Sequence, residues 1–318
     1  MQQGGKLHRL VATPRTVHTG FFDSGIPPVL TIESGDTVNF STMMLMDDQL
    51  RGGMTFEELL ALRQGYADRK VGGHTLTGPI FVAGAEPGDV LEIRIGKLVP
   101  IEFGVNYHLP GHMGIGGLPE DFPRGHFRSF RLDKERWETV FAPGIVLPLA
   151  PFLGVMGVAP KPGERMPAAI PSYFGGNIDN KELREGATLF LPVSVPGALF
   201  SAGDAHAAQG DGEVNVTAIE TALEEAVLQF VVRKDMRLER PVAETPSHWI
   251  TMGFDPDLDE AAKMALRDAI RFLVEGKGFA PDEAYAFASV AVDLRVTQIV
   301  DTNKGIHAMI PKRPFRQE

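Results

Sequence analysis

Short hydrophobic runs rich in β-branched residues, and not long amphipathic stretches, dominate the first two thirds of the chain. Gly-containing turns precede several of them, as in ESGDTVNF, EPGDVLEIRI, REGATLFLPV and GDGEVNVTAI. The clearest runs are Val29–Ile32, Thr37–Phe40, Val90–Ile95, Thr188–Val193 and Val214–Ile219. The pattern predicts a mainly β fold with a sandwich or barrel-like body, and it does not fit alternating βαβ units.

Helical periodicity is confined to three segments. TFEELLALRQ, at residues 55–64, begins with the capping-box pair Thr55 and Glu58. Residues 258–275 place an apolar side chain on one face at every fourth position from Ala262 onward. Residues 281–290 begin with a proline, which is favoured in the first turn of a helix.

The last two helical segments are followed by two strand-like runs, VTQIVD and IHAMI. We therefore predict a β-rich body at residues 1–240, which carries the candidate site, and a C-terminal α/β subdomain of two helices at residues 241–318 packed on it. The two parts can also form one continuous domain, because 318 residues suffice for one large domain or two medium ones.

Composition narrows the possible functions. The chain has 43% hydrophobic and 23% charged residues and a net charge of −10, with no basic run or stripe, so we expect no nucleic-acid partner. It has no Cys, which excludes disulfides, thiolate metal sites and a cysteine nucleophile. The first ten residues lack the apolar region of a secretory signal, so a cytoplasmic location is predicted.

One uncharged segment, Ala142–Pro160, is long enough to suggest a membrane span. Four prolines and three glycines interrupt it, and a helix so interrupted would lose its hydrogen bonds. We predict short strands and loops there, and no membrane partner. The segment could contribute to a homo-oligomer, for which a dimer is the first expectation, but burial within one chain is an equal alternative.

The motif GDAHAAQGDGE at residues 203–213 is the richest in chemistry. Asp204 and His206 are two apart and face the same side of an extended strand, and Asp211 and Glu213 repeat that spacing after a turn. Two strands joined at a bend would bring these groups together as a metal site or an acid/base pair. The alternative is an ordinary turn, since Asp and Gly are common in turns.

Further polar residues stand in glycine-rich surroundings. They are His74 in GGHTLTGPI, Asp47 in MLMDDQL, Glu86 in GAEPGD, and Asn177 with Asp179 and Asn180 in GGNIDNK. Each can be a turn or capping residue, and each can also supply an oxygen or nitrogen ligand, or an amide donor for a substrate carbonyl. Gly104–Phe127 reads as a long loop near the substrate entrance, with His108 and His112 as candidate substrate contacts.

This set of Asp, Glu and His can hold a divalent cation. Zinc takes nitrogen and oxygen ligands, keeps an open position when catalytic, and lowers the pKa of water to about 7. A carboxylate such as Glu213 or Glu86 would then act as general base and acid. Calcium held by carboxylates alone would instead indicate a non-catalytic β binding module. The nucleophile-elbow, P-loop, dinucleotide and H-E-x-x-H signatures are absent from the sequence.

Several motifs together resemble the acetamidase/formamidase family, in order along most of the chain. They are HTGFFDSGIPPVLTIESGD, HTLTGPIFVAGAEPGD, PFLGVMGVAP, GGNIDNK, GDAHAAQGDGE and KGIHAMIPK. The resemblance implies a β-rich, metal-dependent amidohydrolase that cleaves acetamide or formamide to carboxylate and ammonia. By resemblance the metal ligands are Asp47, His74, Asp204 and His206, and the catalytic acids are Glu213 and Glu86. In MMLMDDQL, methionines stand where the family pattern has another acid.

Three functions remain open on the sequence. The first is hydrolysis of a short aliphatic amide by metal-activated water, with zinc as the first choice and calcium as the second. The second keeps the fold and acts on a larger or cyclic amide or another carbonyl compound, because function lies in the site and not in the fold. The third is the non-catalytic, calcium-stabilised module.

Overall fold

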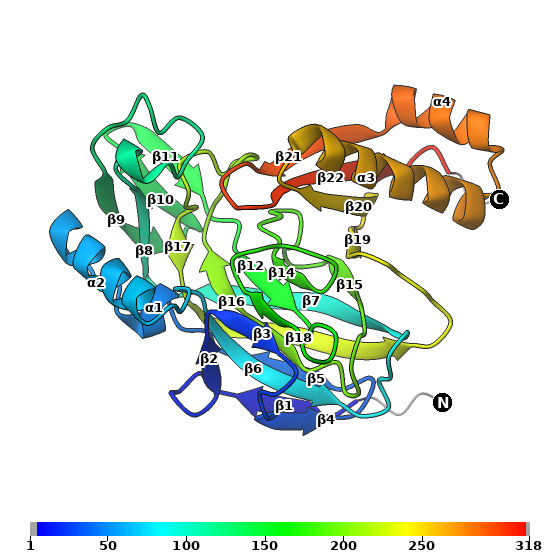
Figure 1. The fold of residues 1–318 in the computed structure, drawn as a ribbon, viewed down its shortest axis with the longest axis horizontal. Coiled ribbons are helices and arrows are strands. Elements are labelled where there is room, and N and C mark those ends of the chain that lie inside the picture. Colours follow the sequence, from blue (N-terminus) through cyan, green and yellow to red (C-terminus); the bar gives the residue numbers. More distant parts are fainter. Residues whose placement is uncertain (1–4, 316–318) are drawn as a thin grey trace.

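The computed structural model describes residues 5–315, and its fold is mainly β, as predicted (Figure 1). Within these residues, a nine-stranded sheet has the order β1-β5-β18-β7-β15-β19-β20-β22-β21. Its strands are β1 (Leu7–Leu10), β5 (Thr37–Phe40), β18 (Leu223–Arg233), β7 (Val90–Pro100), β15 (Thr188–Pro192), β19 (Val242–Glu244), β20 (His248–Asp255), β22 (Lys304–Pro311) and β21 (Asp293–Gln298).

A second sheet of eleven strands, counted over the same residues, follows the order β11-β10-β9-β8-β17-β16-β12-β14, and β6 joins it by pairing with β16, β2 and β4. Its strands are β11 (Ile145–Pro148), β10 (Glu138–Ala142), β9 (His126–Asp133), β8 (Phe103–His108), β17 (Glu220–Thr221), β16 (Phe200–His206), β12 (Phe152–Gly157), β14 (Gly175–Asn177), β6 (Thr75–Val82), β2 (Val17–Thr19) and β4 (Leu30–Ile32). A small separate pair joins β3 (Phe21–Asp23) to β13 (Arg165–Pro167).

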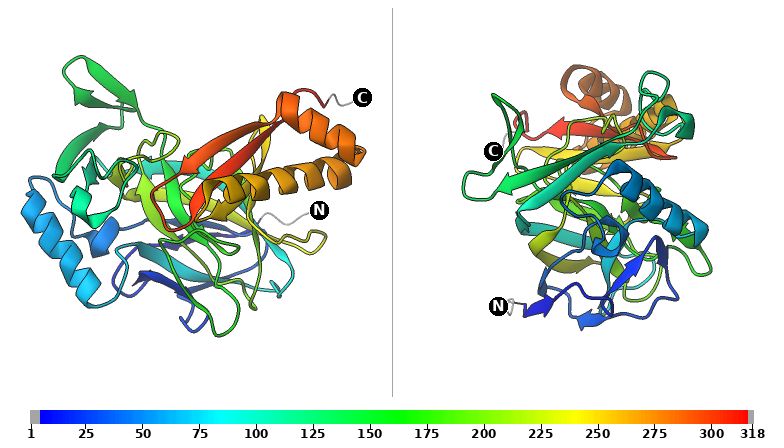
Figure 2. Two further views of the ribbon diagram at one scale, coloured as in Figure 1. Left: turned by 45° about the horizontal axis from the view of Figure 1, so that its top comes forward. Right: turned by 90° about the vertical axis from the view of Figure 1, so that its left-hand side faces the viewer.

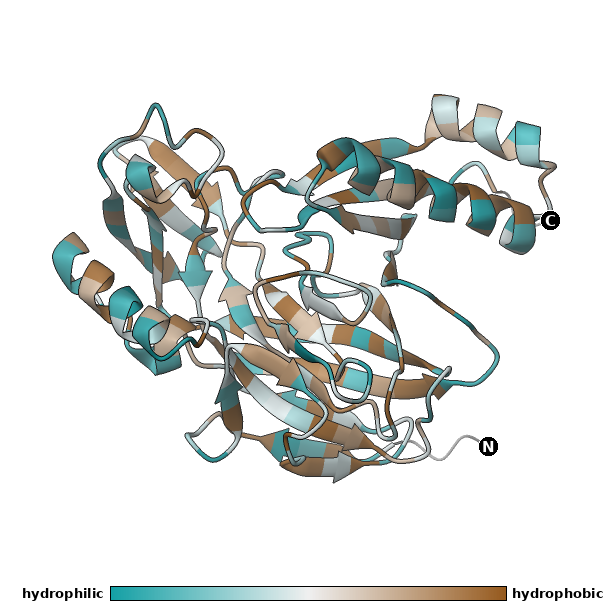
Figure 3. Cartoon of the chain, in the orientation of Figure 1, coloured by the Kyte–Doolittle hydropathy of each residue, from teal (hydrophilic) through white to brown (hydrophobic). Residues whose placement is uncertain are grey.

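The main core lies between the two large sheets. Phe200 on β16 and Phe230 on β18 meet there with ring centroids 5.1 Å apart. Strand β18 alternates buried and more exposed positions along much of its length, as a strand with one face on a core does. Figure 3 shows apolar residues recurring along the strands of this body. The sheets therefore form a sandwich, one of the two predicted arrangements.

Four of the five predicted strand runs are confirmed as β4, β5, β7 and β15, but the strand at Val214–Ile219 is wrong. That segment is a series of turns, in which Val216 has φ 96° and Val214 is 62% exposed. Thr217 replaces the expected ladder, because its hydroxyl both accepts from the Tyr107 N–H and donates to the Tyr107 carbonyl. The residues of this segment alternate as those of a strand do, but within residues 5–315 the segment forms a ladder with no neighbouring strand.

The predicted C-terminal helices are confirmed as α3 (Leu258–Arg271) and α4 (Pro281–Ala291), with a π-helical turn, η2 (Phe272–Gly276), between them. They pack on β20 and β22 around a separate small core, at the upper right of Figure 1 and also in the turned views of Figure 2. The nine-stranded sheet nevertheless runs on from β15 into β19 and β20. The division at residue 240 stays a prediction, since one sheet spans it.

Two further helices lie near the start of the chain, α1 (Leu45–Asp48) and α2 (Phe56–Asp68). The predicted capping box of α2 is present, with Thr55 accepting from the Glu58 N–H and the Glu58 carboxylate accepting from the Thr55 N–H. The long loop predicted at Gly104–Phe127 is shorter than expected. Its first residues belong to β8, which pairs with β9, and a 3-10 turn, η1 (Gly111–Met113), follows.

The uncharged segment at 142–160 forms β11 and β12 with connecting loops, as predicted. Across the described part of the chain, every helix is too short or too polar to cross a membrane.

Candidate metal centre and active site

Strand β16 carries two of the predicted ligands into the interior. All seven of its residues are buried, and it lies between β12, β17 and β6. Asp204 has φ 51°, a left-handed conformation that Asp adopts more readily than most residues. The register places His206 directly opposite Glu220 on β17. A buried acid therefore faces a buried histidine across the ladder.

The two ring nitrogens of His206 face different groups. Nε2 lies 3.3 Å from Glu220 Oε2 and 3.5 Å from Asp204 Oδ2. Nδ1 lies 2.9 Å from Gln209 Oε1, and the Gln209 amide nitrogen donates to the Asp179 carbonyl at 2.7 Å. Because the Gln209 oxygen is thus the acceptor, Nδ1 carries the hydrogen. Nε2 is left to bind a cation between Asp204 and Glu220.

His74 reaches the same place from the turn before β6. The pairing of Leu76 with Gly203 brings this end of β6 beside Asp204, and His74 Nε2 lies 3.6 Å from Asp204 Oδ2. Burial lowers the pKa of His74, an effect that the Asp204 carboxylate reduces, and this favours the neutral imidazole that metals bind. His74 Nε2 and His206 Nε2 thus both face Asp204 Oδ2, and Glu220 lies beside His206 Nε2.

A second set of acids adjoins the first. Asp179, His206 and Glu213 each offer a ligand atom within 4.8 Å of the others. Asp301, from the loop between β21 and β22, accepts a hydrogen bond from the Asn177 amide at 3.0 Å. The loop between β21 and β22 therefore contributes a carboxylate to a centre whose other residues come from earlier in the chain.

Several oxygens of this cluster have no hydrogen-bond partner among residues 5–315. They are both carboxylate oxygens of Asp179, Oδ1 of Asp204 and Oδ1 of Asn177, all buried. Burying carboxylates without donors is costly unless a cation accompanies them. The donor set of imidazole nitrogens and carboxylate oxygens is one that zinc and related divalent cations accept. The residues present therefore fit a metal.

Glycine makes room for the cluster at one position of β12. A Cβ on Gly154 would lie 2.6 Å from Asp179 Oδ1, 2.7 Å from His206 Cε1 and 2.9 Å from the Asp204 carbonyl oxygen. Since side chains do not approach so closely, only glycine fits here. Gly154 also accepts a hydrogen bond from the Asp179 N–H at 3.1 Å, which fixes the backbone beside the site.

Burial and mutual repulsion set the charges of the acids. Burial alone would raise the pKa of Asp204, but His74 and His206 outweigh it and lower that pKa to about 2. Burial raises the pKa of Glu220 to about 7, against the opposing effect of His206, and that of Asp301 also to about 7. Burial, with the repulsion of neighbouring acids, raises the pKa of Glu213 well above its usual range. In the metal-free protein Asp204 therefore stays ionised near neutral pH, whereas Glu213, Glu220 and Asp301 tend to hold protons.

The structure brings His74, Asp204, His206, Glu213 and Asn177 together and places the other predicted residues elsewhere. Asp47 lies on α1, where its carboxylate accepts from the hydroxyls of Thr19 at 2.5 Å, Tyr66 at 2.6 Å and Thr75 at 3.1 Å. Both of its carboxylate oxygens thus already have hydrogen-bond donors, which leaves neither of them open to a cation in the way the unpartnered oxygens of the cluster are. Its contact with Thr75 instead fixes the residue that follows His74.

Glu86 lies in the exposed turn between β6 and β7. Thr75, at the other end of β6, is beside the site, and Val82 is seven residues further along. This turn therefore follows the end of β6 opposite to the one that lies beside the site.

His108 and His112 also lie apart from the cluster. The His108 ring bonds the Arg124 carbonyl at 3.0 Å and packs against Phe122, and His112 is exposed in η1. Their role in substrate binding stays a prediction.

Glu220 and Asp301 are the cluster residues that sequence patterns did not single out, and Asp179 was noted only beside Asn177. Glu220 is a lone acid within the apolar run AIETAL, and Asp301 follows a strand in VDTN. A single carboxylate in an apolar segment can indicate a functional residue. Which other acids lie beside it, however, depends on the order of the strands in the sheet.

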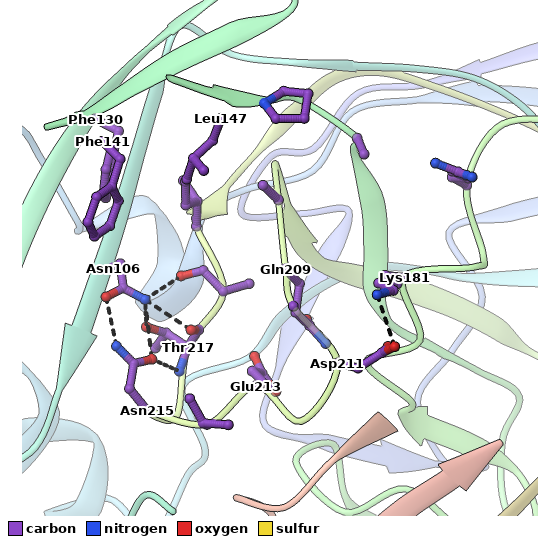
Figure 4. Close-up of a pocket in the computed structure, with 18 of the residues that line it drawn as sticks. Asn106, Phe130, Phe141, Leu147, Lys181, Gln209, Asp211, Glu213, Asn215 and Thr217 are labelled. Carbon is purple, nitrogen blue, oxygen red and sulfur yellow. Dashed lines mark hydrogen bonds and ion pairs between the residues drawn. The ribbon is translucent and has the colours of Figure 1, made fainter. Parts of the chain in front are cut away.

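A pocket of about 550 Å³ opens beside the cluster (Figure 4). Gln209 and Glu213 line it, so the pocket and the cluster share these two side chains. A carboxylate that contacts both a cation site and an open cavity is placed as a general base or acid requires.

Comparison with known proteins identifies the family of the chain. A sequence model of the Acetamidase/Formamidase family matches residues 8–169 and 163–317. The chain belongs to the acetamidase/formamidase family. The resemblance seen in the motifs is thereby confirmed, and with it, at the level of the family, the prediction of a hydrolase acting on linear amides.

Individual family members are similar over most of the chain. An acetamidase structure from Bacillus halodurans has a TM-score of 0.86 and 33% identity, and covers 96% of this chain and 98% of its own. An acetamidase structure from Yersinia enterocolitica has a TM-score of 0.88 and 27% identity, with 99% and 95% covered. The formamidase of Methylophilus methylotrophus is 26% identical, and its alignment covers 72% of this chain and 73% of its own.

Proposed function

We propose that this protein hydrolyses a short aliphatic amide, formamide or acetamide, to carboxylate and ammonia in a cation-dependent reaction. The observation that carries the proposal is the buried cluster of two histidines and several acids, with unpartnered carboxylate oxygens, beside an open pocket. The names of the relatives, acetamidase and formamidase, support the substrate class.

His74, Asp204, His206 and Glu220 are the residues that would hold the cation. Zinc is the first choice, because calcium prefers six to eight oxygen ligands and two histidines are unsuited to it. When bound, such a cation supplies Lewis-acid chemistry, polarising a carbonyl and making water acidic enough to be a nucleophile at neutral pH.

Glu213 performs the proton transfers in this proposal. Its carboxylate lies between the cluster and the pocket, where it can take a proton from the attacking water as the carbonyl carbon becomes tetrahedral. The same carboxyl then gives that proton to the nitrogen as the C–N bond breaks. Ammonia leaves, and the substrate becomes a carboxylate. Glu86 lies beyond the far end of β6 and lines neither the cluster nor the pocket, so the proposal does not give it this role.

Asp47, predicted from the sequence as a ligand, takes a supporting role in the proposal. It holds Thr75 by a side-chain and a backbone contact, and so orients the adjacent His74. A homo-oligomer, with a dimer expected first, and a cytoplasmic location are further predictions that sedimentation and fractionation can test.

Elemental analysis and an ammonia-release assay test the proposal together. We expect one cation per chain or more in the active protein, and loss of both cation and activity in His206→Ala. Glu213→Gln should keep the cation and lose activity by about 10²- to 10⁴-fold. Glu86→Gln is the matched variant, expected to keep both. Full activity in protein verified to be metal-free would overturn the mechanism, and an inactive Glu86→Gln would move the proton transfer.

A further inference from the structure

The pocket beside Glu213 is larger than formamide or acetamide requires. These amides have three and four heavy atoms, whereas cavities of about 300–1,000 Å³ are those that enclose drug-sized ligands. The volume here is about 550 Å³. A short amide held at Gln209 and Glu213 would leave most of this space to solvent.

One side of the pocket is apolar and rigid. Phe130 and Phe141 stack with ring centroids 6.0 Å apart and 25° between their planes. The Arg128 guanidinium lies 4.5 Å from the centroid of Phe141 and 5.2 Å from that of Phe130, which holds the pair in place. Leu147 on β11 continues the same surface, and Figure 4 shows the three labelled side chains together, away from Glu213.

Several polar residues of the pocket are engaged with one another, whereas Arg184 and Glu182 line it without such a pairing among residues 5–315. Asn106 and Asn215 exchange hydrogen bonds at 2.8 and 3.3 Å, and Asn106 also donates to the Thr217 hydroxyl at 2.9 Å. Lys181 pairs with Asp211 at 3.0 Å on another side, as the dashed lines in Figure 4 show. The paired groups need no polar ligand, so the surface that gains most from a ligand is the apolar one.

We propose that this pocket binds an apolar substituent of the substrate, so that the preferred substrates are amides bearing an aryl or alkyl group of about six to ten heavy atoms. The inference rests on the proposed function, since the amide end is placed at Gln209 and Glu213. The substituent lies against Phe141, Leu147 and Phe130. Reaction balance is unchanged: water adds to the carbonyl carbon, the C–N bond breaks, and the nitrogen leaves protonated.

Kinetics with matched substrates test the inference in the metal-loaded protein. Acetamide is compared with 3-phenylpropanamide, which carries the substituent on the acyl side, and with N-benzylacetamide, which carries it on nitrogen. We expect kcat/KM for at least one substituted amide to exceed that for acetamide by about tenfold or more. If acetamide is hydrolysed and neither substituted amide is better, the pocket proposal falls and the proposed function stands.

A variant of the apolar wall gives the second readout. Phe141→Ala removes one ring of the stacked pair at a position that is 40% exposed, and should lower the ratio of kcat/KM, substituted amide over acetamide, by about tenfold. Val140→Ala is the control, because Val140 is the exposed neighbour on β10 and does not line the pocket. The proposal would be overturned if this ratio were unchanged in Phe141→Ala. It would also be overturned if the variant changed its oligomeric state and lost kcat/KM equally on every substrate.

Binding measurements test the pocket independently of catalysis. Titration calorimetry with 3-phenylpropanoate and acetate, the acids formed from two of these amides, needs no turnover. We expect 3-phenylpropanoate to bind at least about tenfold more tightly, and Phe141→Ala to remove the difference. If no amide is hydrolysed, the proposed function fails, and this titration still decides whether the pocket takes an apolar group. Equal affinities for acetate, 3-phenylpropanoate and benzylamine, the product that carries the substituent on nitrogen, would reject it.

Discussion

His206 Nδ1 lies 2.9 Å from the side-chain oxygen of Gln209, and that contact determines which face of the imidazole is free. Gln209 uses its amide nitrogen on the Asp179 carbonyl, so its oxygen can only accept. Nε2 consequently faces Asp204 and Glu220, where a proton or a cation can bind it. Partners of this kind orient metal-binding histidines and raise their affinity for the cation.

Gln209→Leu should therefore weaken cation binding by about 10- to 100-fold, because it removes the acceptor for Nδ1–H. Gln209→Glu, which keeps an acceptor, should recover most of the affinity. Competition with a chromogenic chelator measures both. Gln64→Leu, an exposed residue of α2, is the control. Equal affinity in Gln209→Leu and Gln64→Leu would show that Gln209 does not orient the ring.

Gly154→Ala should destabilise the protein and disturb the centre at once. Its Cβ would meet Asp179 Oδ1 at 2.6 Å and His206 Cε1 at 2.7 Å, and overpacking of this kind costs about 1–3 kcal/mol. Denaturant unfolding and cation content give the two readouts. The comparison is Gly65→Ala in the interior of α2, where nothing lies within 4 Å of the new Cβ and a gain of about 0.5–1 kcal/mol is expected. A neutral Gly154→Ala would contradict this account.

The strands and helices were largely predictable because their signals are local. The capping box of α2 and the apolar face of α3 each lie within one segment of sequence. Val214–Ile219 shows the limit of such signals. Its alternation is that of a strand, but Thr217 bonds the backbone of β8 through its side chain, and no ladder forms.

The site could be predicted only in part. Asp204 and His206 share one strand face, which a two-residue spacing reveals. Glu220 joins them because β17 pairs with β16 in one particular register, and Asp301 arrives on the loop between β21 and β22. Neither relationship has a signature in the sequence, because both depend on sheet order and on the packing of distant segments.

The substitution Asp47→Asn tests whether Asp47 is a metal ligand or a residue that positions His74. The structure gives Asp47 three hydroxyl donors, which leave neither carboxylate oxygen open to a cation, so we expect the variant to keep its full cation content. Its cation affinity should fall modestly, since Thr75 beside His74 would be less well fixed. His74→Ala is the comparison and should bind the cation far more weakly. Loss of the cation in Asp47→Asn equal to that in His74→Ala would make Asp47 a ligand, as the sequence predicted.

Metal removal should make stability depend on pH in a direction set by the buried acids. The pKa values of Glu220 and Asp301 are raised to about 7, chiefly by burial. Near pH 6 the folded, metal-free protein thus holds protons that the unfolded chain has released. Stability then falls as pH rises from about 4, the ordinary carboxyl pKa, to about 7. A cation replaces these protons and should restore stability at the higher pH.

Thermal unfolding of chelator-treated and zinc-loaded protein at pH 5 and pH 8 measures this linkage. We expect the metal-free Tm to be lower at pH 8 than at pH 5, and zinc to raise Tm more at pH 8, where no proton competes for the ligands. Glu220→Gln keeps the shape of the side chain without its charge, so it should flatten the metal-free pH dependence. A metal-free Tm that rises between pH 5 and pH 8 would contradict this prediction. It would mean that protein donors stabilise the ionised acids, so that they need no cation.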